Sequence, residues 1–143
     1  MNPVNFLRGA SILAVIHSIL HTIGGVFGKP DLAIQEQVLK TMRDNAFPIM
    51  GMTRTYADFY RGFGLAISVF LLAEGIVFWQ LATMAKTDSA RLKPVLITFT
   101  LLYLGMATVS AVYFFPPPVV TEVLLAACLV GAIATAKAPQ ALR

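Results

Sequence analysis

Four apolar segments, each long enough to cross the hydrocarbon core of a membrane, constrain the fold of this chain more than any other feature. They cover about residues 5–27, 56–81, 94–114 and 119–136. A transmembrane helix needs about 20 predominantly apolar residues. Because lipid offers the backbone no hydrogen-bond partner, each segment must be helical. We therefore predict an all-α integral membrane protein whose four spans form a four-helix bundle.

The amino-acid composition agrees with this class and excludes several others. Hydrophobic residues make up 57% of the 143 residues and charged residues 13%, whereas soluble domains average about 45–50% and about 25%. A composition this rich in hydrophobic residues and this poor in charge excludes a disordered chain. A soluble domain of this length cannot bury so much apolar surface, so most cytosolic enzyme folds are excluded as well. Cys128 is the single cysteine, which excludes an internal disulfide and a paired-thiol redox site. The length predicts one domain, residues 1–143.

The connection between the first two spans, residues 28–55, contains a predicted helix of its own at about residues 31–46. Asp31 is its expected N-cap, and Glu36 and Lys40 form an i,i+4 pair. The apolar side of its helical wheel contains Leu32, Ile34, Val38, Leu39, Met42 and Ala46. We expect an amphipathic helix that lies in the outer membrane interface. It would serve as a lid over a cavity between the spans, or only as a packed cap.

Lysine and arginine counts set the expected orientation, because cytoplasmic loops carry an excess of both residues. With the N-terminus inside, the inner set is Arg8, Lys86, Arg91, Lys93, Lys137 and Arg143. The smaller outer set is Lys29, Lys40, Arg43 and Arg54. We predict that both termini are cytoplasmic, and the compact loops favour a bacterial inner membrane.

Polar side chains inside the spans are the candidate functional residues, because ionisable groups in hydrocarbon are costly. The expected catalytic residues are His17 and His21, which lie four residues apart on one helix face and would transfer protons. The expected ligand-binding residues are Asp58, Tyr60, Arg61, Glu74, Tyr103, Tyr113 and Glu122. No local motif adds a third ligand to the histidine pair, so no metal site is predicted, and the cofactor is left open.

The expected depths of these residues place most of them in the outer half of the membrane. At about 1.5 Å of rise per residue, one layer contains His21, Tyr60, Arg61, Tyr113 and Glu122. His17 lies about 6 Å deeper than His21. We predict a polar cavity there that opens toward the outer face. Glu74 falls on the other side of the midplane and is expected to make a different contact.

Each of these residues also has a structural interpretation. The histidines would make helix-packing hydrogen bonds, and Asp58 would pair with Arg61 or Arg54 at the interface. Glu122, in the expected first turn of the fourth span, would be stabilised by the helix dipole. Glu74 must be protonated, paired or within reach of water. Small residues at helical spacing predict close helix contacts at Ala10/Ala14/Ser18, Gly64/Ser68 and Ala127/Gly131/Thr135.

The order of these features resembles small four-helix membrane proteins of the DoxX-like kind and, more loosely, the EXPERA sterol-isomerase and sigma-2-receptor group. The resemblance covers most of the chain as topology: a polar first span, a long first connection, an acidic second span and a short last hairpin. In the EXPERA group, acidic and histidine side chains surround a hydrophobic amine or sterol, and His17, His21, Asp58 and Glu74 are of these types. No diagnostic motif aligns the positions, so no catalytic residue is carried over.

Three functions remain as alternatives. The first is binding of a hydrophobic small molecule, such as a quinone, terpenoid or lipid, with His17 or His21 transferring protons and Arg61 or Tyr60 holding its polar head. Whether such a protein is an enzyme is left open. The second is an accessory or scaffold subunit without chemistry, and the third is a dimeric proton-coupled exporter that uses Glu74. Expected partners are membrane lipid, the ligand, and a second copy or another membrane protein. No nucleic-acid motif is present.

Overall fold

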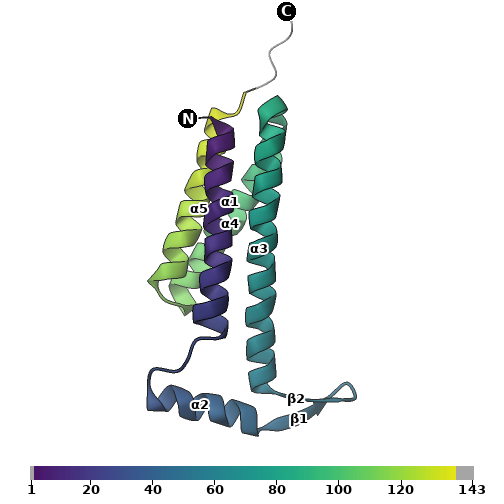
Figure 1. Ribbon diagram of the computed structural model, residues 1–143, viewed down its shortest axis with the longest axis vertical. Coiled ribbons are helices and arrows are strands. Elements are labelled where there is room, and N and C mark those ends of the chain that lie inside the picture. The colour runs from purple at the N-terminus through teal and green to yellow at the C-terminus, as the bar shows by residue number, and fades with distance from the viewer. Residues whose placement is uncertain (1, 138–143) are drawn as a thin grey trace, which may run out of the picture. The chain divides into compact units, whose positions relative to one another are not determined.

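A computed structural model describes residues 2–137 of the chain and is mostly helical (Figure 1). The described part contains five α-helices: α1 Pro3–Leu20, α2 Ala33–Asp44, α3 Tyr56–Asp88, α4 Lys93–Tyr113 and α5 Pro116–Thr135. A π-helical turn, η1, follows α1 at His21–Val26, and a 3₁₀ turn, η2, occupies Ala90–Leu92. Strands β1 (Ala46–Ile49) and β2 (Met52–Thr55) form an antiparallel hairpin.

Four of the helices are long and apolar enough to cross a membrane, so length and composition make this a multi-pass membrane protein. They are Pro3–Val26, Tyr56–Asp88, Ala90–Tyr113 and Pro116–Thr135. Helix α3 continues past the end predicted at residue 81. The residues that follow are less apolar, but Ala82, Met84, Ala85 and Lys86 all favour a helix. Helix α5 begins at Pro116 and not at the predicted residue 119, because proline is tolerated in the first turn of a helix.

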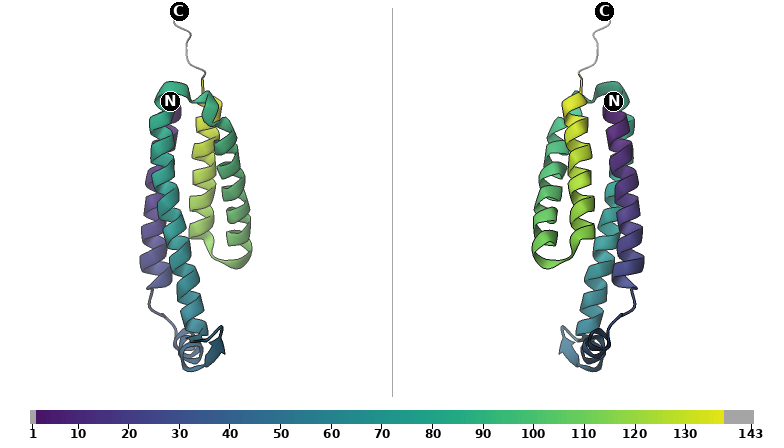
Figure 2. Two further views of the ribbon diagram at one scale, coloured as in Figure 1. Left: turned by 90° about the vertical axis from the view of Figure 1, so that its right-hand side faces the viewer. Right: turned by 90° about the vertical axis from the view of Figure 1, so that its left-hand side faces the viewer.

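The chain divides into two compact units. One contains residues 2–17 and 71–137 of the described chain, and the other is Ser18–Phe70. Both α1 and α3 contribute residues to each unit. In the first unit, α4 and α5 form an antiparallel helical hairpin (Figure 2). Its buried core includes Leu7, Ala10, Phe78, Leu96, Leu125 and Leu129.

Close helix contacts in the first unit occur where a side chain is small. Ser11 Oγ donates a hydrogen bond to the carbonyl oxygen of Gly75 at 2.6 Å. A Cβ atom at Gly131 would lie 2.5 Å from a ring carbon of Phe6, so only glycine admits that ring. Gly131 belongs to a small-residue set that the sequence predicts to be a helix contact.

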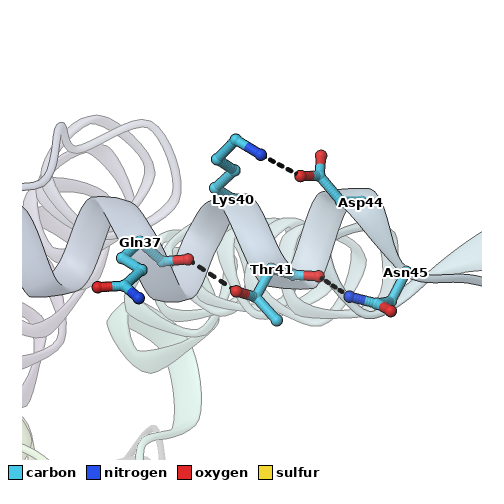
Figure 3. A network of polar contacts seen from close by, with 5 residues as sticks. All are labelled: Gln37, Lys40, Thr41, Asp44 and Asn45. Atoms are coloured by element: carbon cyan, nitrogen blue, oxygen red, sulfur yellow. Dashed lines mark hydrogen bonds and ion pairs between the residues drawn. The ribbon is translucent and has the colours of Figure 1, made fainter.

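Helix α2 lies in the second unit and is held by local polar contacts (Figure 3). It begins at Ala33, and the predicted Asp31 cap is wrong: Gln35 Oε1 accepts the backbone N–H groups of Asp31 and Leu32 at 2.9 and 3.2 Å. Lys40 pairs with Asp44 at 2.5 Å and not with Glu36. Thr41 Oγ1 donates to the Gln37 carbonyl, and Asn45 donates to the Thr41 carbonyl. Helix α2 buries none of its residues.

The hairpin formed by β1 and β2 is absent from the sequence-based expectation. Its two-residue turn, Met50-Gly51, has φ angles of 48° and 80°, and two positive values are typical of the type I′ turn that suits a hairpin. Gly51 adopts such angles readily, whereas Met50 does so at some cost. The ring of Phe47 lies 4.9 Å from that of Tyr56 and 5.9 Å from that of Phe59, and these contacts fix the hairpin against the start of α3.

The start of α3 is closed by a reciprocal capping box between Thr55 and Asp58. The Asp58 carboxylate accepts from Thr55 N–H at 2.8 Å and from the Thr55 hydroxyl at 3.0 Å, while Thr55 Oγ1 accepts from Asp58 N–H at 3.1 Å. Thr55 is the N-cap residue and Asp58 the N3 residue of this capping box. Asp58 therefore serves the helix terminus, and within residues 2–137 it forms no ion pair with Arg54 or Arg61, because the ion pairs found there are Lys40–Asp44 and Asp88–Arg91.

Thr55→Ala is expected to destabilise the first turn of α3. Loss of an N-cap hydroxyl costs about 1 kcal/mol, which corresponds to roughly fivefold faster local opening. Amide hydrogen exchange at the start of α3 measures this opening. Thr53→Ala is the matched control, because no hydrogen bond of the Thr53 side chain is found in the described chain. Equal exchange rates in the two variants would contradict the assignment of the cap.

Candidate functional site

The residues singled out from the sequence are divided between the two units. The first unit contains His17, Glu74, Tyr103, Tyr113 and Glu122, and the second contains His21, Asp58, Tyr60 and Arg61. Within residues 2–137, no set of three or more His, Cys, Asp or Glu side chains gathers in a way that could hold a metal ion.

In the second unit, His21 contacts Ser68 across the gap between η1 and α3. His21 Nδ1 lies 3.1 Å from Ser68 Oγ. The Ser68 hydroxyl donates to the Gly64 carbonyl, and the Ser68 carbonyl accepts from Ser18 Oγ. The donor in the contact between His21 and Ser68 depends on the tautomer of the imidazole ring, because each partner can donate or accept. Tyr60 and Arg61 are exposed, and neither is part of this network.

In the first unit, Glu74 of α3 is paired with Tyr103 of α4. The Tyr103 hydroxyl donates to Glu74 Oε2 at 2.6 Å. Tyr103 is only 2% exposed, and its ring packs near Phe78, while Glu74 is half-buried. The sequence requires that Glu74 be protonated, paired or within reach of water, and Tyr103 is the partner that the structure provides. His17 of α1 is also buried, and it interacts with another part of the protein.

A second carboxyl–hydroxyl pair lies between α4 and α5. Ser110 Oγ donates to Glu122 Oε1 at 3.0 Å. Glu122 is 3% exposed, and its other oxygen, Oε2, has no hydrogen-bond partner in the described part of the chain. The predicted position of Glu122 in the first helical turn is wrong, because α5 begins at Pro116 and its first turn contains no acidic residue. The dipole effect falls off within that turn, so Ser110 is the main stabilising contact.

Ser110 also lines a pocket at the turn between α4 and α5. The pocket has a volume of about 300 Å³ and is lined by Ser110, Ala111, Phe114, Phe115, Pro116, Val119 and Val120. All of the lining side chains except Ser110 are apolar. Ser110 is therefore both a lining residue of the pocket and the hydrogen-bond partner of the buried carboxyl of Glu122. Tyr113, in contrast, is 76% exposed and is not a lining residue.

Ser110 is not among the site residues predicted from the sequence, although its position in the fourth helix indicates a polar contact. Tyr103 and Ser110 are seven residues apart, and both belong to the buried face of α4 together with Thr100 and Ala107. Two hydroxyl groups on one face of an apolar span indicate polar partners on neighbouring helices. Which helices supply those partners depends on how the spans are rotated about their axes, which a single sequence does not fix.

Comparison of the chain with protein-family models, with curated proteins and with solved structures found no significant match.

Proposed function

We propose that this protein binds a hydrophobic small molecule, such as a quinone, terpenoid or lipid-like compound, inside a membrane. The observation that supports this function best is the Ser110–Glu122 pair behind the pocket at the α4–α5 turn. Ligand pockets are mostly apolar with a few convergent polar groups, and this pocket has that composition. Its volume is near the lower end of the usual range of about 300–1,000 Å³, so the ligand is small.

The unpartnered oxygen of Glu122 favours a binding role over a purely structural one. A buried polar atom without a hydrogen bond costs about 1–3 kcal/mol, and such groups in native proteins call for an explanation. A polar group of a ligand that reached Oε2 would supply the missing hydrogen bond. Packing alone supplies no reason to place a carboxyl there.

We further propose that the four spans form a bundle with both termini in the cytoplasm of a bacterial cell, and that α2 lies in the outer interface. The guanidinium carbon of Arg8 lies 5.3 Å from the centre of the Trp79 ring. Arginine and tryptophan are both typical of membrane–water interfaces. Their contact supports an interface near the start of α1, which the lysine and arginine counts of the sequence predict to be the inner one. Arg143, one residue of those counts, lies outside the described residues.

Native mass spectrometry of the protein, purified from its native membrane in mild detergent, tests the binding function. We expect a bound small molecule at one copy per chain. Ala111→Phe should abolish the adduct, because residue 111 lines the pocket and is exposed, so that the larger ring fills the pocket without disturbing the core. Ala73→Phe changes an exposed alanine of α3 outside the pocket and should retain the adduct. Adduct-free protein in every preparation would oppose this function and favour a scaffold subunit.

Proton-coupled transport is a second candidate, supported by the hydrogen bond between Tyr103 and Glu74 inside the apolar spans. An intramembrane carboxyl with a hydroxyl partner can take up and release a proton. This function predicts that Glu74→Gln abolishes proton-driven substrate accumulation in proteoliposomes. Full transport by that variant would exclude Glu74 as the coupling residue. The histidines His17 and His21 remain proposed proton-transfer groups.

A further inference from the structure

One face of the β1–β2 hairpin in the second unit is apolar and exposed. Residues paired across an antiparallel hairpin point to the same side, and the side alternates along each strand. The register pairs Ile49 with Met52 on one side. Phe47 and Arg54, the next pair but one, lie on that same side, and the contact of 3.6 Å between Arg54 Nη2 and Met52 Sδ agrees with this. Both Ile49 and Met52 are exposed.

The turn at the tip of the hairpin adds a further exposed apolar side chain. Met50 is 98% exposed, although its φ of 48° belongs to a turn type that favours asparagine, aspartate or glycine at this position. Neither packing nor turn geometry therefore accounts for a methionine there. A contiguous exposed apolar surface marks a site where another molecule or a membrane is in contact. The apolar residues of this surface, which we call the hairpin patch, are Phe47, Ile49, Met50 and Met52.

The hairpin patch is continuous with the exposed surface of α3. The ring of Phe47 is nearly parallel to that of Phe59 at 5.9 Å, and the ring of Phe59 lies 6.3 Å from that of Phe63. Phe59 and Phe63 are four residues apart, so they share one face of the helix, and both are exposed. Helix α3 is long and apolar enough to span a membrane, and the exposed apolar side chains of such a helix face lipid. A row of rings thus leads from the lipid-facing side of α3 to the hairpin.

The start of α3 has the side chains of a membrane–water interface. Tyr56 and Tyr60 are both exposed, and tyrosine is enriched where a span leaves the hydrocarbon. Thr55, the last residue of β2, precedes Tyr60 by about 8 Å of helix rise, which is close to the headgroup thickness of about 5–8 Å on each side of a bilayer. The hairpin leaves α3 sideways and does not continue along the helix axis (Figure 1), so it stays near that level.

We propose that the β1–β2 hairpin is a membrane-surface anchor, whose hairpin patch inserts among the phospholipid headgroups beside the start of α3. A bilayer is the partner that meets this surface without a break, because the same lipid that contacts Phe59 and Phe63 reaches the patch. Arg54 shares the apolar face and forms no ion pair among residues 2–137, so its guanidinium is available to a lipid phosphate. Such anchors set the tilt and rotation of a span. The inference does not depend on the proposed ligand site.

Quenching of tryptophan fluorescence by brominated lipid tests the anchor. Trp79, the single tryptophan of the chain, is replaced in Trp79→Phe, and one reporter is introduced by Met52→Trp or, as the matched control, by Thr53→Trp. Positions 52 and 53 are exposed neighbours on β2 whose side chains point to opposite faces. In proteoliposomes of phosphatidylcholine brominated on its acyl chains near the headgroup, the Met52→Trp reporter should lose most of its fluorescence. The Thr53→Trp reporter should lose little and be quenched by aqueous acrylamide instead.

Equal quenching of the two reporters by the brominated lipid would overturn the proposal. So would a Met52→Trp reporter that neither the lipid nor acrylamide quenches, because a protein surface such as a second copy would then cover the patch.

A charge at the tip provides the second test. Met50→Glu should reduce the lipid quenching of the Met52→Trp reporter to the level of the Thr53→Trp reporter, because a carboxylate is unfavourable below the headgroups. Thr53→Glu adds the same charge on the opposite face and should leave that quenching unchanged. All three positions are exposed, so these changes remove no core contact. Undiminished quenching in Met50→Glu would contradict insertion of the tip.

Discussion

Gly75→Leu is expected to lower the free energy of unfolding by about 1–3 kcal/mol. A Cβ atom at position 75 would lie 2.7 Å from Val15 Cγ2 and 3.3 Å from the Ser11 carbonyl oxygen, so α1 and α3 must separate to admit any side chain. Separation also breaks the bond from Ser11 Oγ to the Gly75 carbonyl, which is worth about 0.6 kcal/mol in a membrane protein. Unfolding by SDS in mixed micelles measures the change.

Gly105→Leu is the matched control for this prediction. Gly105 also lies within a span, but no atom lies within 4 Å of a Cβ built there. Both variants gain about 1 kcal/mol of helix propensity, so they differ only in the collision at position 75. Gly105→Leu should therefore be neutral or slightly stabilising. Similar losses in the two variants would show that the close contact of α1 with α3 at Gly75 is not formed.

Tyr103→Phe is expected to destabilise the protein by about 1–2 kcal/mol, because it removes the donor to Glu74. The phenylalanine ring keeps the packing against Phe78, so the loss reports the hydroxyl group. The double variant Tyr103→Phe, Glu74→Leu completes a double-mutant cycle, because leucine offers no acceptor to the Tyr103 hydroxyl, and we expect a coupling energy of about 1 kcal/mol. Unfolding in mixed micelles again provides the measurement.

The control for the tyrosine hydroxyl is Tyr113→Phe. Tyr113 lies on the same helix but is 76% exposed, and within residues 2–137 its hydroxyl forms no hydrogen bond with another side chain or the backbone. The substitution should change stability by less than about 0.5 kcal/mol. A coupling energy near zero for Tyr103 and Glu74 would mean that their contact does not contribute to the folded state.

The four long helices could be predicted because an apolar run of about 20 residues has few alternatives in a membrane. Their ends were harder to predict, because hydropathy marks contact with lipid whereas a helix continues wherever its residues allow. For this reason α3 extends to Asp88 and α5 begins at Pro116. The hairpin at residues 46–55 escaped prediction because Met50, at the first turn position, is not a residue that usually favours a positive φ.

The polar residues could be identified from the sequence, but their partners could not. A charge in an apolar span is conspicuous wherever it lies, which is why Glu74 and Glu122 stand out. Their hydroxyl partners, Tyr103 and Ser110, come from α4, and the pairing depends on the rotation of each helix. The same is true of the small residues. The sequence predicts a helix contact at Gly131, but only the structure identifies Phe6 as the residue that it contacts.

Photo-crosslinking with a diazirine-bearing terpenoid alcohol, in proteoliposomes of the full chain, tests the central claim most directly. If the pocket at the α4–α5 turn is a ligand site, peptide mass spectrometry will find the label concentrated at residues 110–120. Excess menthol will compete it away, and Ala111→Phe will reduce it while Ala73→Phe will not. Label spread over the exposed apolar faces of all four spans, unchanged by menthol and by Ala111→Phe, would contradict the claim.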